Sequence, residues 1–122
     1  MLLDTRLLLW ALRQPAKLSA ATRTQIDAAD VDASAASIWE ISIKAALAKL
    51  KADPSEVLAA IVPAGFGLLS ITGAHAAKVA NLPAFHKDPF DRMLIAQASL
   101  EPMILLTNDI ALRAYGAFVE LV

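Results

Sequence analysis

Short apolar runs alternate with longer helical patterns along almost the whole chain, and this alternation limits the folds open to it. The run MILLT at residues 103–107 has the length of a strand, whereas residues 5–14 show helical periodicity that stops before Pro15. Strands separated by helices call for a parallel sheet with right-handed crossovers and helices on both faces. The pattern therefore predicts a single three-layer α/β domain over residues 1–122, with a central parallel sheet flanked by helices.

Caps and turn residues set the boundaries of the expected elements. Strands are expected at residues 1–3, 31–37, 66–71, 103–107 and 117–122. Helices are expected at residues 5–14, 19–29, 38–50, 53–63 and 72–83, then from Asp88 onward, with a short helical piece at 109–115.

Composition narrows the possible functions. The apolar share of 57% exceeds the roughly 45–50% of ordinary soluble domains, which favours a sheet buried on both faces and an oligomer or partner surface. The chain has no cysteine and two histidines, so thiolate zinc sites are excluded and most other zinc centres are disfavoured. A formal charge of −1 gives no general attraction to nucleic acid, so any RNA binding has to be local or helped by a cation.

The sequence predicts neither a membrane-spanning segment nor a signal peptide. No apolar stretch approaches the roughly 20 residues that span a bilayer. Asp4 stands where a signal peptide would carry basic residues and then its apolar core. We therefore expect a soluble, cytoplasmic protein with no membrane contact.

Four acidic residues fall where strands end and helices begin, which is where open parallel sheets form their sites. Asp4 ends the first strand, Glu40 opens the helix after the second, Asp91 lies in a first helical turn, and Asp109 follows MILLTN. Capping alone can also explain them: Asp4 and Asp109 can cap helices, and Glu40 can complete a capping box with Ser37. Four converging carboxylates, however, would repel one another unless a cation compensates.

The stretch HKDPFDRMLIAQA, which begins at His86, holds two aspartates with different expected roles. Asp88 suits an N-cap with Pro89 after it, whereas Asp91 is better placed to serve a metal site. Carboxylates without cysteine suit Mg²⁺ or Mn²⁺, which can activate water and stabilise charge on a phosphodiester. The predicted chemistry is phosphodiester hydrolysis.

Taken together, the motifs MLLDTRLLLWAL, SAASIWEISIKAALAKL, LPAFHKDPFDRMLIAQA and LLTNDIALRAYG resemble, in this order, the PIN-domain family, and specifically the VapC-type toxins of toxin–antitoxin pairs. The resemblance covers almost the whole chain. It implies an Mg²⁺- or Mn²⁺-dependent endoribonuclease that is silenced by a cognate VapB-type antitoxin and is usually a homodimer. By motif, the catalytic and metal-binding acids are Asp4, Glu40, Asp91 and Asp109, supported by Thr107 and Asn108.

Two departures from the family pattern stand out. Arg6 occupies a position where these toxins often carry histidine, so a long cation lies near Asp4, where it could bind a substrate phosphate or lie on the surface. Ala48 replaces a glycine common in LGKL, and we expect it to be tolerated inside a helix because alanine has the higher helical propensity.

Several other residues have two interpretations each. Lys44 has the spacing of an ordinary salt bridge with Glu40 but could also meet RNA, and Arg92 could support Asp91 or be an exposed charge. His86 could touch substrate, although a loop histidine without a role is the simpler interpretation. Trp10 and Trp39 are expected in the core or at an interface. Basic residues could form a rim for RNA or a solvated surface: Arg13, Lys49, Lys51 and Lys87.

Other function classes remain open on the sequence. A PIN-like binding module would keep the fold and tolerate Asp91→Asn, with Arg6 partly neutralising the acidic pocket. A receiver-like signalling domain also sets acids around Mg²⁺ at strand ends, but MILLTND offers no lysine after the late strand. The metal-dependent ribonuclease is the favoured hypothesis.

Overall fold

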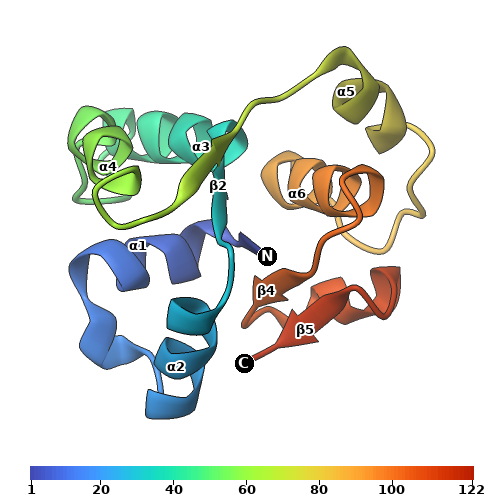
Figure 1. Cartoon of the computed structure of the whole chain (residues 1–122). Helices are drawn as coiled ribbons and strands as arrows, with labels where there is room; N and C mark the ends of the chain where they lie inside the picture. The colour runs from blue at the N-terminus through green and yellow to red at the C-terminus, as the bar shows by residue number, and fades with distance from the viewer.

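The computed structural model describes residues 1–122 and contains the five strands and seven helices that the sequence predicts, together with one additional 3-10 helix, η1 (Figure 1). The strands are β1 (Leu2–Leu3), β2 (Asp32–Ser34), β3 (Gly67–Leu69), β4 (Leu105–Thr107) and β5 (Val119–Leu121). The helices are α1 (Thr5–Arg13), η1 (Pro15–Lys17), α2 (Ala20–Ala28), α3 (Ala35–Ala46), α4 (Pro54–Ile61), α5 (Gly73–Val79), α6 (Pro89–Leu100) and η2 (Ile110–Tyr115).

The five strands form one sheet in the order β3-β2-β1-β4-β5, and every neighbouring pair is parallel. The chain builds outward from β1 to β3, then crosses back so that β4 pairs with the other side of β1. Leu2 of β1 lies opposite Asp32 of β2 and Leu105 of β4. Because the winding direction changes between β1 and β4, their carboxyl ends flank a crevice of the kind in which such sheets bind ligands.

Side chains of the central strands alternate between two apolar cores. Leu3, Ala33 and Leu106 face a cluster that also contains residues of α1, α2 and α4. Leu2 and Leu105 face the opposite cluster, which contains residues of α6 and η2. Figure 1 shows α1 and α2 on one side of the strands and α6 on the other. The predicted three-layer α/β fold is therefore confirmed.

Helix α3 begins three residues earlier than the sequence suggests. The Ala/Ser alternation at residues 31–37 resembles a strand, but Ser34 is the N-cap and its hydroxyl accepts from the Ala36 amide. Alanine is also the best helix former, so the chain turns helical at Ala35. Ser37 therefore lies inside the helix, and the alternative that it forms a capping box with Glu40 is wrong.

The end of α3 overturns the expectation for Ala48. The Lys49 amide donates to the Lys44 carbonyl and the Ala48 amide to the Ala45 carbonyl, which is the hydrogen-bond pattern of a Schellman motif. Ala48 has φ of 54°, in the left-handed region where glycine is favoured. It lies just past the helix instead of inside it, so alanine's helical propensity gives no benefit there.

The two tryptophans differ in their surroundings. Trp10 is partly buried and packs against the α1 side of the core, as expected for a core residue. Trp39 is 51% exposed and packs in a T-shaped arrangement with Phe90, so it is not a core residue. Together with Ile43 and Leu47 it forms an exposed apolar row on α3. None of the helices has the length and apolar character that crossing a membrane requires.

Candidate active site

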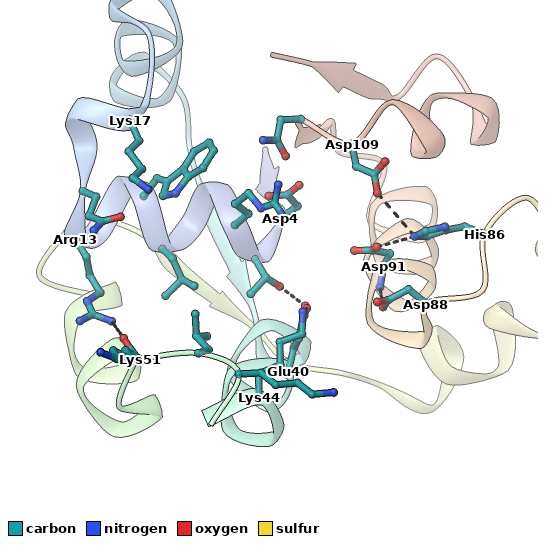
Figure 2. Close-up of a pocket in the computed structure, with 18 of the residues that line it drawn as sticks. Asp4, Arg13, Lys17, Glu40, Lys44, Lys51, His86, Asp88, Asp91 and Asp109 are labelled. Atoms are coloured by element: carbon teal, nitrogen blue, oxygen red, sulfur yellow. Dashed lines mark hydrogen bonds and ion pairs between the residues drawn. The ribbon is translucent and has the colours of Figure 1, made fainter. Parts of the chain in front are cut away.

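A cleft of about 1020 Å³ opens at the carboxyl ends of the strands and contains all four acids predicted from the sequence. Figure 2 shows Asp91, Asp109 and His86 on one side, Asp4 in the middle, and Arg13, Lys17 and Lys51 on the other. The acidic residues of the cleft lining are Asp4, Glu40, Asp88, Asp91 and Asp109, and His86 lies among them. Its lysines and arginines are Arg6, Arg13, Lys17, Lys44, Lys49 and Lys51.

Asp4 lies at the base of the cleft, directly after the central strand β1. One carboxylate oxygen, Oδ1, accepts from the Leu7 amide at 2.8 Å and so caps α1. The other, Oδ2, accepts from the Thr107 hydroxyl at 2.5 Å. Burial raises the pKa of Asp4, and the hydrogen bond from Thr107 opposes that rise. The capping interpretation is thus correct, and it leaves the carboxylate at the cleft.

Glu40 projects from the second turn of α3 and is held from two sides. The Thr5 hydroxyl donates to Glu40 Oε1 at 2.7 Å, and Lys44 Nζ contacts Oε2 at 2.5 Å. The predicted salt bridge between Glu40 and Lys44 is therefore present. Its hydrogen bond with Glu40 raises the pKa of Lys44. Glu40 is 6% exposed, so the pair fixes a buried carboxylate at the cleft wall.

Asp88 and Asp91 divide their roles at the start of α6. Asp88 Oδ1 accepts from the amides of Phe90 and Asp91, at 2.9 and 3.0 Å, as an N-cap. Asp91 Oδ2 contacts His86 Nε2 at 2.9 Å, whereas its Oδ1 accepts no hydrogen bond from the chain. Burial and the negative charge of Asp88 raise the pKa of Asp91 to about 6, although His86 opposes the rise. The predicted capping role of Asp88 is confirmed.

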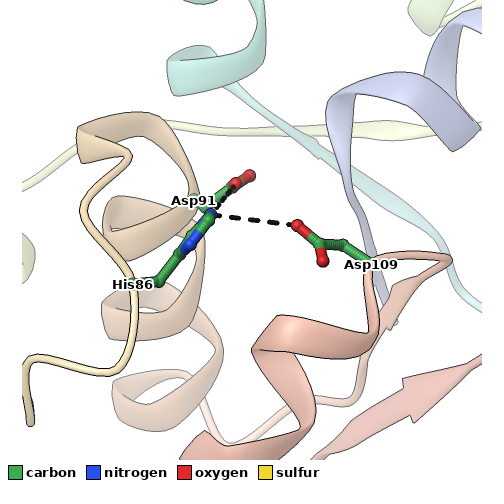
Figure 3. Close-up of side chains that lie close together, drawn as sticks. All are labelled: His86, Asp91 and Asp109. Atoms are coloured by element: carbon green, nitrogen blue, oxygen red, sulfur yellow. Dashed lines mark hydrogen bonds and ion pairs between the residues drawn. The ribbon is translucent and has the colours of Figure 1, made fainter.

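Asp109 approaches the same histidine from the opposite element. Its Oδ1 accepts from the Ala111 amide and caps η2, while Oδ2 lies 3.8 Å from His86 Nε2 (Figure 3). The Asp109 amide donates to the Thr107 hydroxyl at 3.0 Å. Thr107 therefore connects Asp4 and Asp109, and the neighbouring Asn108 also lines the cleft.

His86 is the site residue that the sequence argument missed. The sequence favoured a loop histidine without a role over one that touches substrate, but His86 lies beside two of the predicted acids. His86 Nε2 and one oxygen each from Asp91 and Asp109 lie within 4.8 Å of one another. The available signal was its place just before the Asp88 cap, since a loop that leads into the helix can fold back over the first turn.

Arg92 supports the site indirectly. Its guanidinium donates to the backbone carbonyls of Pro83 at 2.8 Å and Val79 at 2.9 Å, and to the Tyr115 hydroxyl at 3.1 Å. These bonds hold the loop that precedes α6 and make no contact with the Asp91 carboxylate. Arg6, by contrast, lines the cleft, and its positive charge partly opposes the rise that burial causes in the pKa of Asp4.

The donor set fits a hard divalent cation. The cleft offers carboxylates and no sulfur, and Asp91 Oδ1 is left without a hydrogen bond. The structure brings Asp91 and Asp109 close together. Asp4 and Glu40 line the same cleft but lie outside this close group, each held by its own hydroxyl donor.

Comparison with known proteins identifies the family to which this fold belongs. The family model of the PIN domain matches residues 1–117. The chain belongs to the PIN domain family. A search of the curated proteins finds no match. Among solved structures, this PIN domain is similar to a chain from the crystal structure of VapBC2 from Rickettsia felis bound to a DNA fragment from their promoter. The TM-score is 0.70 at 15% identity over 99% of this chain and 96% of that one. At this identity the likeness shows the fold alone.

Proposed function

We propose that this PIN domain is a divalent-metal-dependent endoribonuclease and the toxin of a VapBC-type toxin–antitoxin pair. The observation that carries the proposal is the division of charge within one cleft. Five acids line it together with six of the eleven lysines and arginines of a chain whose net charge is −1. An acidic centre beside a basic wall suits a metal that acts on a phosphate and cations that hold the neighbouring phosphates.

The basic wall provides the local attraction to RNA that the net charge lacks. Arg13 of α1, Lys17 of η1 and Lys51 after α3 lie away from the acids, on the opposite side of the cleft (Figure 2). Cations along a groove bind the phosphates of a single strand, and an aromatic ring can stack on a base. Trp10 lines the same wall, with Lys17 Nζ 5.8 Å from its ring centre.

The acids would hold Mg²⁺ or Mn²⁺, with Asp4, Glu40, Asp91 and Asp109 as the candidate ligands. PIN nucleases typically use divalent metals, and such an ion supplies a metal-activated water and stabilises the charge that develops on the phosphodiester. The chain itself keeps the carboxylates in place. Thr107 orients Asp4, Thr5 and Lys44 hold Glu40, and the helix caps hold Asp109 and the backbone of Asp91.

The proposal includes two protein partners, a VapB-type antitoxin and a second copy of this chain. The fold neighbour is described as VapBC2 with promoter DNA, which supports a VapB-type antitoxin as the protein partner here. The apolar row of Trp39, Ile43 and Leu47 on α3 supports a homodimer, because exposed apolar groups of this kind mark protein interfaces.

The test is cleavage of labelled total RNA by the purified, antitoxin-free protein with Mg²⁺ or Mn²⁺. Discrete products are expected, and they should disappear with EDTA and in Asp91→Asn. Asp53→Asn is the matched control, since Asp53 precedes Pro54 and caps α4 outside the cleft. Two outcomes contradict the proposal and favour a PIN-like binding module, in which Arg6 offsets the acidic charge. One is no cleavage, and the other is cleavage that persists in Asp91→Asn and so comes from a contaminating ribonuclease.

A further inference from the structure

The proposed function assigns no role to His86, although its side chain lies beside two of the candidate ligands. Its Nε2 atom lies 2.9 Å from Asp91 Oδ2 and 3.8 Å from Asp109 Oδ2 (Figure 3). The side chain is 26% exposed and lines the cleft. One nitrogen and two carboxylate oxygens therefore converge at a point reached from the cleft.

The backbone of His86 is held on both sides, so the ring does not reach the acids from a free loop. The His86 amide donates to the Tyr115 hydroxyl at 3.0 Å, and its carbonyl accepts from Arg92 Nη1 at 3.4 Å. Arg92 also donates to the Tyr115 hydroxyl. Arg92 follows Asp91 in α6, and Tyr115 ends the η2 helix that Asp109 caps. The elements that carry the two acids thus also position the histidine.

Ion pairing of a protonated His86 with Asp91 and Asp109 is the alternative explanation for three donor atoms within 4.8 Å of one another. Such pairing would leave Asp91 Oδ1 without a partner. A neutral imidazole is a good ligand for transition metals, whereas Mg²⁺ is bound chiefly by oxygen. A nitrogen beside two carboxylates is therefore a donor set that distinguishes between divalent cations.

We propose that His86 is a nitrogen ligand of the divalent cation and, with Asp91 and Asp109, makes the site prefer Mn²⁺ to Mg²⁺. This inference rests on the proposed metal-dependent function and specifies which ion the site selects. The inference adds a nitrogen ligand to the four carboxylates that the proposed function names.

The test is metal binding to the full chain without RNA. Pulsed EPR of the Mn²⁺-loaded protein should show coupling to one histidine nitrogen. The assignment is direct because the chain has two histidines, and His75 is buried with its Nε2 against Glu101, outside the cleft. By calorimetry, His86→Gln, which offers oxygen in place of nitrogen, should reduce the preference for Mn²⁺ over Mg²⁺ by about tenfold or more. Thermal unfolding without metal checks that the variant is folded.

The outcomes separate the two proposals. If Mn²⁺ binds the wild-type protein and Asp91→Asn abolishes binding, but no nitrogen coupling is seen, the assignment of His86 is wrong and the metal site stands. If the wild-type protein binds neither ion at this site, the proposed function fails with it. The coupling is measured on the wild-type protein, so the test holds even if His86→Gln does not fold.

Discussion

The Thr107 hydroxyl donates a hydrogen bond to Asp4 Oδ2 across the two central strands, joining residues that lie 103 positions apart in the sequence. The same hydroxyl oxygen accepts from the Asp109 amide. Thr107 is fully buried, and its bond to Asp4 is buried with it, whereas the bond from the Asp109 amide is partly buried. One side chain thus sets the orientation of one candidate ligand and the backbone position of another.

Thr107→Val is expected to destabilise the protein by about 1–3 kcal/mol, because it leaves Asp4 Oδ2 and the Asp109 amide without their partner. Thr107→Ser keeps the hydroxyl and should cost less. Chemical denaturation measures the stabilities, and calorimetry measures Mn²⁺ affinity, which should fall in the valine variant. Equal stability and affinity for all three proteins would show that the hydroxyl does not position the acids.

The raised pKa of Asp91 makes the metal-free protein less stable as pH rises. The folded-state pKa is about 6 and the ordinary value is 3.8, so the folded state binds more protons between these values. Stability should therefore fall as pH rises through this range and through the folded-state pKa, with the loss complete near about pH 7. In EDTA above that pH, Asp91→Asn should be more stable than the wild-type protein, and added Mn²⁺ should stabilise only the wild-type protein. Thermal unfolding at about pH 5 and about pH 7.5 measures both effects; a pH-independent difference between the proteins contradicts the assignment.

Ala48→Gly is expected to stabilise the fold by about 1 kcal/mol, because a left-handed conformation costs a residue with a Cβ about that much. Ala46→Gly is the matched control: it makes the same chemical change at an exposed position in the last turn of α3, and should destabilise by roughly 0.5–1 kcal/mol. Urea denaturation of the two variants should give opposite signs. Destabilisation by both would mean that residue 48 is helical in solution.

Tyr115→Phe tests the bonds that hold the loop before α6. Phenylalanine keeps the edge contact with Phe85 but removes the oxygen that binds Arg92 and the His86 amide. The expected cost is about 1 kcal/mol, with faster hydrogen exchange at the His86 amide than in the wild-type protein. Amides within β4 serve as the internal reference. Unchanged exchange at His86 would show that the loop is held by other contacts.

Ile43→Asp tests the proposed homodimer. Ile43 is exposed on the apolar row of α3, so a charge there should leave folding intact but prevent two copies from packing through this face. Light scattering should show a dimer for the wild-type protein and a monomer for the variant. A wild-type monomer, or a variant that still dimerises, would place the interface elsewhere.

The sequence predicted the features that depend on local patterns. Asp53, Asp88 and Asp109 cap helices as their positions suggest, and the apolar runs became the parallel strands. The start of α3 was misplaced because Ala and Ser are compatible with either structure, and the hydrogen bond from Ala36 to Ser34 decides between them. Local pattern carries no information about which of two acceptable structures the surrounding fold selects.

Prediction of the candidate site from the sequence has the same limit. Chain order and strand ends brought Asp4, Glu40, Asp91 and Asp109 to one cleft, as expected of a parallel sheet. The role of His86 depends on a loop that Tyr115 and Arg92 hold in place, and Tyr115 lies 29 residues away along the chain. Neither helical periodicity nor spacing reports such a contact.

The strand order also sets when the cleft can form. β1 can pair with β2 early in synthesis, but its other edge stays open until β4 emerges and inserts beside it. Until then Asp4 lacks Thr107, and Asp109 does not yet exist. The cleft is therefore assembled late, once the segment from β4 to Ile110 has joined the sheet, and the proposed ribonuclease site does not exist before that step.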